Sequence, residues 1–288
     1  MQKNTYSAKH SSTKLTKALL CIIWILIIAV LVSIGVVFTQ KAMQIDGKAD
    51  AEKSSGAEIN STVLTVVYDD TYSKTVPGFI LLNFNSNSGA ISVASIPADV
   101  KSKVNEKSGT LFEQYKYGGI IQVKNALESL CDIKIDHYLQ IECELLSSVA
   151  DIMGTVEYNV PDKMYQKSDG GAILCDIKKG KQSLGAQQFT EFFRYGGWNY
   201  SEKADNLAKL TRAMINTYST EEKAQKIPTL FSETATELYT DISVIGANEL
   251  SSSYNDFMVL KSTAAEISIV EDNGVLSEKS LKNIKNIF

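Results

Sequence analysis

One arginine stands out among the side chains that could bind a ligand. The chain contains 29 lysines and arginines, of which only Arg194 and Arg212 are arginines. Arg194 lies in EFFRYGGWNY, residues 191–200, between aromatic side chains and two glycines. Its planar guanidinium matches phosphate oxygens with paired hydrogen bonds, and glycines let a ligand approach the backbone. A surface arginine stacked on an aromatic ring fits the same pattern, so both interpretations stay open.

Aspartates at predicted strand ends are the candidate metal ligands. Asp69 and Asp70 follow the β-branched segment TVLTVVY, and Asp99 follows SIP. Mg²⁺ prefers such oxygen ligands. Aspartate is also common where strands turn, and from the residues alone that interpretation comes first.

Other catalytic patterns are missing from the sequence. Beyond the first forty residues there is one histidine, His137, within an alternating segment typical of a strand. No G-x-S-x-G, Walker, H-E-x-x-H or C-x-x-C pattern occurs, which argues against serine and metalloproteases. The net charge of −4 argues against a nucleic-acid partner.

The N-terminal region predicts a membrane anchor. Residues 19–38 carry no charge, and twenty helical residues span roughly 30 Å, the thickness of a bilayer core. More lysines precede this run than follow it, which places the N-terminus in the cytoplasm. We therefore expect a cytoplasmic tail (1–18), a transmembrane helix (19–39), a polar tether (40–61) and one extracytoplasmic domain (62–288) of a single-pass cell-membrane protein.

Strand and helix patterns alternate along the outer part, which predicts an α/β fold with helices covering a sheet. Strands are expected at 62–68, 137–142 and 155–160, in a hairpin over 78–96, and at 257–260 and 265–270. Helical stripes occupy 120–130, 145–153, 203–218, 227–239 and 277–288, and residues 162–183 read as a polar loop. The outer cysteines have no metal-ligand spacing. They favour buried thiols, although a bridge between the first two is conceivable: Cys131, Cys143 and Cys175.

Several blocks of the outer part resemble the LytR-CpsA-Psr family. IDHYLQIECELLSSVADIMGTVEYNVP (135–161) is similar to the family's central strand, helix and strand, and AISVASIPADV to its VTLLSIPRDT. YKYGG, IKKGKQSLGAQQFTEFFRY and IPTLFSETATELYTDIS follow in the family's order. The resemblance extends over essentially 62–288.

The resemblance implies an α/β/α arrangement around a mixed sheet, with an apolar pocket for a polyprenyl chain. Family members move an anionic glycopolymer from polyprenyl pyrophosphate to peptidoglycan, using arginines and Mg²⁺ held by aspartates. It therefore implies catalytic roles for Arg194 and Asp99. It further implies phosphate binding by Arg194, Lys74 and Lys203, and a metal site from Asp69, Asp70 and Asp99.

The sequence departs from the family mainly at charged positions. Ala98 stands where the family has the arginine of SIPRD, and Gly196 replaces the second arginine of VRYR. Lysine-rich composition alone would not put alanine and glycine there. Two hypotheses follow: a glycopolymer phosphotransferase with a diverged phosphate clamp, or a degenerate homologue that binds a polyprenyl-phosphate lipid or an active paralogue without turnover. A transcriptional role ranks below both, because an outside domain cannot touch DNA.

Overall fold

The computed structural model describes residues 60–69, 75–85, 90–224, 226, 238–241 and 264–288. The predicted transmembrane helix, the tether up to residue 59, Asp70 and Lys74 lie outside these ranges. Among the described residues, no helix combines the length and hydropathy needed to cross a bilayer.

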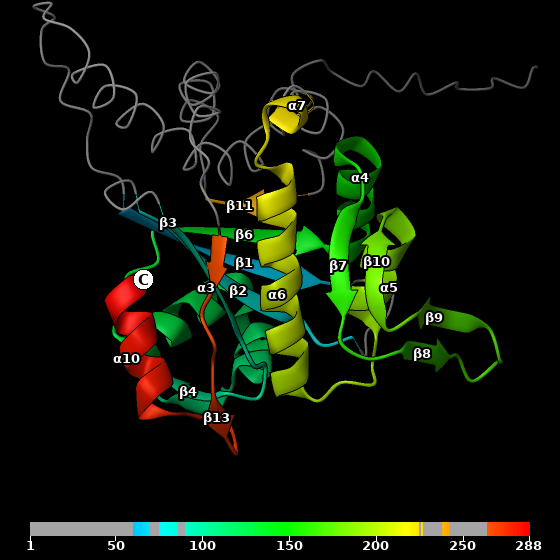
Figure 1. Ribbon diagram of the computed structural model, residues 1–288. Helices are drawn as coiled ribbons and strands as arrows, with labels where there is room; N and C mark the ends of the chain where they lie inside the picture. The colour runs from blue at the N-terminus through cyan, green and yellow to red at the C-terminus, as the bar shows by residue number, and fades with distance from the viewer. Residues whose placement is uncertain (1–59, 70–74, 86–89, 225, 227–237, 242–263) are drawn as a thin grey trace, which may run out of the picture.

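A mixed six-stranded sheet forms the centre of the molecule (Figure 1). Its spatial order is β11 (Leu238–Thr240), β6 (His137–Glu142), β1 (Asn60–Tyr68), β2 (Gly78–Asn85), β3 (Ala90–Ile96) and β12 (Ala264–Glu266). The pairs β1–β2, β2–β3 and β6–β11 are antiparallel, whereas β1–β6 and β3–β12 are parallel. The predicted hairpin over 78–96 and the strands at 62–68 and 137–142 are confirmed.

The two faces of the sheet carry separate apolar cores, because successive strand residues point to opposite sides. In β1, Val63 and Val67 face one core, while Leu64 and Val66 face the other. Apolar residues thus occupy both the odd-numbered and the even-numbered positions of the central strands, as expected for a sheet covered on both faces.

Helix α3 (Leu111–Cys131) covers one face, and α10 (Glu278–Ile287) packs beside it. Thr110 and Glu113 form a capping box at the start of α3. The helix is kinked at Gly118 and Gly119, and the φ of 63° at Gly119 is one that glycine adopts without strain. The predicted stripe of Leu281, Ile284 and Phe288 does face this core, as expected.

Helices α4 (Cys143–Met153), α5 (Ala186–Arg194) and α6 (Tyr200–Tyr218) cover the other face. Helix α4 ends at Gly154, whose φ is 95°, and α6 starts with a capping box of Asn199 and Glu202. The three-layer α/β/α arrangement is therefore confirmed for the described residues.

The prediction of a loop over 162–183 is wrong. After β7 (Val156–Val160), this segment forms β8 (Met164–Lys167) and β9 (Ile173–Ile177), which pair as a hairpin, and β10 (Gly180–Leu184) pairs with β7. In the sequence, polar residues at the outward positions mask the period-two alternation of these strands. Met164, Cys175 and Ile177 are nevertheless buried in the core. The hairpin projects beside α5 (Figure 1).

The remaining elements are short. They are β4 (Lys101–Val104), β5 (Lys107–Thr110), β13 (Glu271–Asp272), β14 (Val275–Leu276) and α7 (Glu221–Ala224). Of the helix expected at 227–239, residues 227–237 lie outside the described residues, and β11 begins at Leu238. The strand expected at 257–260 also lies outside them, and the one expected at 265–270 extends only over β12.

Candidate functional site

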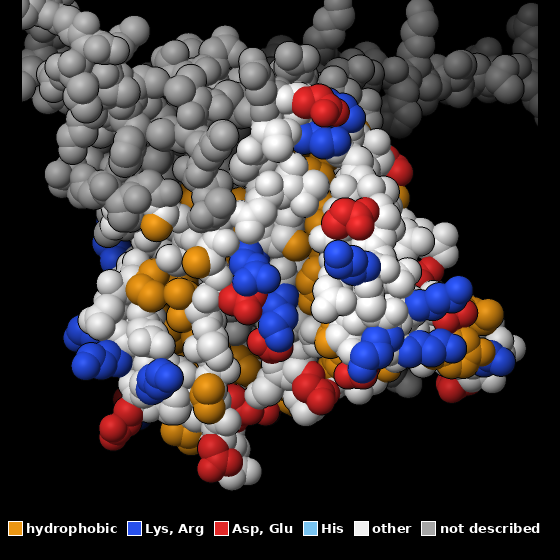
Figure 2. Space-filling model, viewed as in Figure 1, with side chains coloured by type: hydrophobic (Ala, Val, Ile, Leu, Met, Phe, Trp, Pro, Cys, Tyr) orange, Lys and Arg blue, Asp and Glu red, His pale blue; other side chains and the backbone are white. Residues whose placement is uncertain are grey.

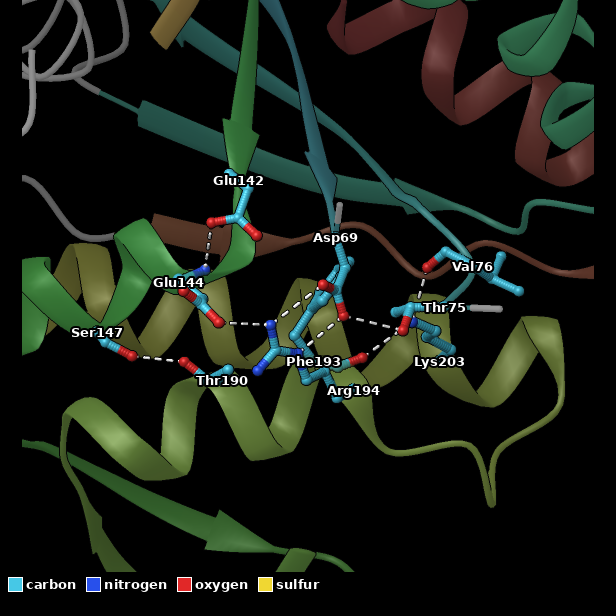
Figure 3. Close-up of polar contacts among 10 residues, drawn as sticks. All are labelled: Asp69, Thr75, Val76, Glu142, Glu144, Ser147, Thr190, Phe193, Arg194 and Lys203. Carbon is cyan, nitrogen blue, oxygen red and sulfur yellow. Dashed lines mark hydrogen bonds and ion pairs between the residues drawn. The ribbon is translucent and has the colours of Figure 1, made fainter. Parts of the chain in front are cut away.

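Arg194 is tied to the end of the first strand by a buried ion pair (Figure 3). Its Nε donates to Oδ2 of Asp69 at 2.8 Å and its Nη2 to Oδ1 at 3.1 Å. The Asp69 side chain is fully buried, and Thr75 donates a further hydrogen bond to it at 3.0 Å. This two-point contact fixes the plane of the guanidinium.

Helix α5 brings Arg194 to this point because its apolar face is locked into the core. Phe189, Phe192 and Phe193 follow helical spacing and are almost completely buried. Arg194 is the last residue of the helix, so its side chain leaves the core at the sheet end where β1 also stops. The sequence analysis did not predict this helix.

Two glutamates complete the surroundings of Arg194. Strand β6 runs parallel to β1 with Tyr68 opposite Glu142, so Glu142 and Asp69 lie at neighbouring strand ends. Glu142 caps α4 by accepting the backbone N–H of Glu144, and Nη2 of Arg194 donates to the Glu144 carboxylate at 2.9 Å. Burial raises the pKa of Glu142, with the neighbouring carboxylates adding to the shift. Burial alone would lower the pKa of Arg194, but its hydrogen bonds to Asp69 and Glu144 raise the pKa above its ordinary value.

Lys203 lies beneath Arg194 and is bound to backbone. Its ammonium donates to the carbonyl oxygens of Val76 at 2.7 Å and Phe193 at 2.9 Å, and it sits 4.2 Å from the centroid of the Phe193 ring. Burial lowers the pKa of Lys203 to about 8. Two of its three N–H donors therefore hold α5 to the segment before β2.

Glu142, Glu144, Arg194 and Lys203 line part of a cavity of about 1180 Å³. The cavity lies between the β8–β9 hairpin, the starts of α4 and α6, and α5. Most of its lining side chains are polar or aromatic, among them Glu144, Gln166, Thr190, Glu191, Arg194, Trp198 and Tyr200. The apolar lipid pocket implied by the resemblance stays a prediction, because the lining of this cavity mixes polar and apolar surface. Basic and acidic side chains are interspersed on the face shown in Figure 2.

Of the two glycines after Arg194, Gly196 contributes a backbone hydrogen bond and Gly197 leaves room for a close contact. The N–H of Gly196 donates to Oε1 of Gln166 at 2.8 Å, which ties the β8–β9 hairpin to the end of α5. A Cβ on Gly197 would lie 2.4 Å from the ring of Tyr195. Glycine at 197 thus lets the chain pack against its own tyrosine.

Asp99 lies apart from Arg194. It is not among the residues that line the large cavity, and its carboxylate neighbours Glu271 and Lys101. Burial and Glu271 raise its pKa, and one of its oxygens has no hydrogen-bond partner. Strand β3 ends at the same end of the sheet as β1 but two strands away, roughly 10 Å across the sheet. Its predicted roles with Arg194 stay predictions.

Ala98, which stands where the family has an arginine, and Arg212, the second arginine of the chain, both lie outside the cavity that Arg194 lines. Ala98 is buried and lines a small void together with Lys203. Arg212 pairs with Glu266 at 3.4 Å on α6, outside the cavity that Arg194 lines.

The described residues make a poor Mg²⁺ site in this arrangement. Asp69, Glu142 and Cys143 have ligand atoms within 4.8 Å of one another. However, both oxygens of Asp69 already accept N–H groups from Arg194, and burial raises the pKa of the Cys143 thiol to about 12. A protonated thiol is not a magnesium ligand. These donors therefore do not fit Mg²⁺, and the Mg²⁺ requirement stays a prediction.

The thiols are free, as the sequence favoured. The structure contains no disulfide among the described cysteines, which are all buried: Cys131, Cys143 and Cys175.

Comparison with known proteins identifies the family. The LytR_cpsA_psr family model matches residues 38–287. The chain belongs to this family. A relative from Halalkalibacterium halodurans, the polyisoprenyl-teichoic acid–peptidoglycan teichoic acid transferase TagU, is 23% identical over 193 residues. That match covers 65% of this chain and 61% of the length of the relative.

Solved structures show the same fold at low identity. TagV of Bacillus subtilis superposes with a TM-score of 0.60 at 18% identity, covering 80% of this chain and 96% of that one. A putative transcription regulator from Eubacterium siraeum gives 0.65 at 14% identity, with 84% and 98% covered. TagT bound to LI-WTA gives 0.56 at 17% identity, with 83% and 92% covered.

The sequence analysis missed the glutamates of the site. Glu142 ends a strand that the sequence did predict, and parallel neighbouring strands end at the same edge of a sheet. The alternation in HYLQIE, extended to its last residue, carried that signal.

Proposed function

We propose that this family member is a membrane-anchored, extracytoplasmic protein of cell-envelope assembly that binds the phosphate groups of a polyprenyl-linked glycopolymer at Arg194. The observation that carries the proposal is a guanidinium held by the fully buried Asp69 on the wall of a large cavity of mixed polar and apolar lining. Because Asp69 and the core fix its orientation, Arg194 is preorganised to receive phosphate oxygens.

The first candidate activity is transfer of the glycopolymer to peptidoglycan, the reaction named for the TagU relative. In that reaction an acceptor hydroxyl oxygen bonds to the phosphorus next to the glycopolymer. The P–O bond to the carrier phosphate breaks and polyprenyl phosphate leaves. Arg194 stabilises the negative charge spread over the phosphate oxygens.

The second candidate is binding of the lipid carrier, or of an active paralogue, without turnover. The favouring observation is the local charge. Three carboxylates meet at this position, those of Asp69, Glu142 and Glu144. The cations are those of Arg194 and Lys203, so carboxylates outnumber cations among these described residues. With Lys203 committed to two carbonyls, the site offers a transferring phosphate little positive charge.

The test uses the two arginines as a matched pair. The full-length chain in detergent is incubated with a polyprenyl-pyrophosphate-linked sugar, with and without a peptidoglycan acceptor. Arg194→Lys keeps the charge beside Asp69 but removes the fork, whereas Arg212→Lys makes the same change on α6, where the arginine pairs with Glu266.

Transfer that falls about tenfold or more in the first variant, but not in the second, supports the transferase. Native mass spectrometry reports whether the lipid stays bound. Lipid binding that is lost only in Arg194→Lys, in the absence of any transfer, supports binding without turnover. Equal behaviour of the two variants in both assays refutes a phosphate site at Arg194.

A further inference from the structure

The two acidic partners of Arg194 differ in how firmly they are held. Asp69 has no exposed side-chain area and meets two nitrogens of the guanidinium. Glu144 accepts from Nη2, and 56% of its side-chain area is exposed. If Arg194 left Asp69, a buried carboxylate would lose its partner. If Arg194 left Glu144, the released carboxylate would be solvated.

Glu144 also stands where a ligand must arrive. It lines the same cavity as Arg194 and lies in the first turn of α4, next to the capping Glu142. Asp69, by contrast, lies behind the guanidinium and is not among the residues that line the cavity. In Figure 3, Glu144 and Asp69 lie on opposite sides of the Arg194 guanidinium, so an anion entering the cavity meets Arg194 on the side that Glu144 occupies.

We infer that the Glu144 carboxylate occupies the subsite on Arg194 that a phosphate oxygen of the ligand takes. Asp69 is the permanent partner that orients the guanidinium, and Glu144 is the exchangeable one. Binding of a pyrophosphate group is then an exchange, in which one anionic oxygen replaces another at Nη2. This inference rests on the proposed phosphate site and adds that Glu144 sets the affinity of that site.

The charge of Glu144 opposes the ligand in two ways. The ion pair must break, and the released carboxylate stays within a few ångströms of an incoming polyanion. Breaking an exposed ion pair costs little by itself. Repulsion between the released carboxylate and a multiply charged ligand adds to the cost of binding. Removing the charge should tighten pyrophosphate binding about three- to tenfold at low salt, and by less at high salt because the interaction is screened.

Inorganic pyrophosphate is the probe, titrated calorimetrically into the full-length chain in detergent. Glu144→Gln and Glu144→Ala are compared with Glu191→Gln. Glu191 lines the same cavity, but its carboxylate accepts from Gln187 and the backbone of Asp176 rather than from Arg194. All three substitutions remove one negative charge from the same wall.

The expected result is tighter binding in both Glu144 variants and a change of less than about twofold in Glu191→Gln. Equal affinity of wild type and the Glu144 variants, or equal gains in all three, overturns the inference while leaving the phosphate site in place. Absence of pyrophosphate binding by wild type and every variant refutes the phosphate site itself, and the inference with it.

Discussion

Replacement of Lys203 by methionine should abolish a specific pH dependence of stability. Lys203 is 8% exposed, and its ammonium lies between the end of α5 and the segment before β2. Burial lowers its pKa from 10.5 to about 8 in the folded protein. Methionine fills a similar volume without a titrating group, so the difference between the two proteins isolates this one proton.

The direction follows from proton binding. Between pH 8 and pH 10.5 the unfolded chain keeps the Lys203 proton, whereas the folded protein has largely released it. The unfolded state binds more protons there, so the free energy of unfolding rises with pH in that window. From pH 7 to pH 9.5 the contribution of Lys203 amounts to about 2 kcal/mol.

Buried thiols act in the opposite direction above pH 9. Burial raises the pKa of Cys131 and Cys143 to about 12 and that of Cys175 to about 11. The folded protein then holds these protons longer than the unfolded chain, which lowers stability as pH rises. Because both proteins carry the thiols, this effect largely cancels in the difference.

The assay is urea unfolding of the full-length chain followed by tryptophan fluorescence at several pH values from 7 to 9.5. Lys209→Met on the same helix is the matched control, because Lys209 is exposed and pairs with Asp205. We expect the stability of wild type minus Lys203→Met to increase by about 2 kcal/mol over this range. A difference that stays constant, or that changes equally in the control, refutes a lowered pKa at Lys203.

Three further predictions concern the fold of the described residues. Arg194→Met should lower the free energy of unfolding by about 3–5 kcal/mol in urea titrations, because it strands the fully buried Asp69 carboxylate; a loss below 1 kcal/mol would contradict the buried ion pair. Gly119→Ala should cost about 1 kcal/mol in the same titration, because residue 119 has a positive φ although a Cβ there would meet no other atom, and unchanged stability would argue against this kink geometry. At pH 8, three thiols should react with a maleimide far more slowly in the native chain than in urea, and rapid native labelling of any of them would be inconsistent with their burial: Cys131, Cys143 and Cys175.

Local patterns in the sequence were sufficient for most of the sheet and its helices. Period-two alternation in TVLTVVY and HYLQIE, and apolar stripes in α4 and α6, report burial of one face, which depends on residues close together in the chain. They failed for the β8–β9 hairpin, where the buried positions are few and separated by polar residues. They failed also for α5, because Phe192 and Phe193 were read as surroundings of Arg194 rather than, with Phe189, as a core-facing stripe.

The sequence by itself determined that Arg194 is exceptional, that the outer part is α/β, and that the family's charged positions are depleted. Only the tertiary structure decided what Arg194 contacts. Asp69 lies 125 residues away along the chain, and Glu144 50 residues away. Their meeting depends on the parallel pairing of β1 with β6 and on the packing of α5, and residue types at one position do not encode such long-range pairings. The same packing directs the Lys203 ammonium to two backbone carbonyls, because a buried ammonium must find acceptors where the fold provides them, and its phosphate binding stays a prediction.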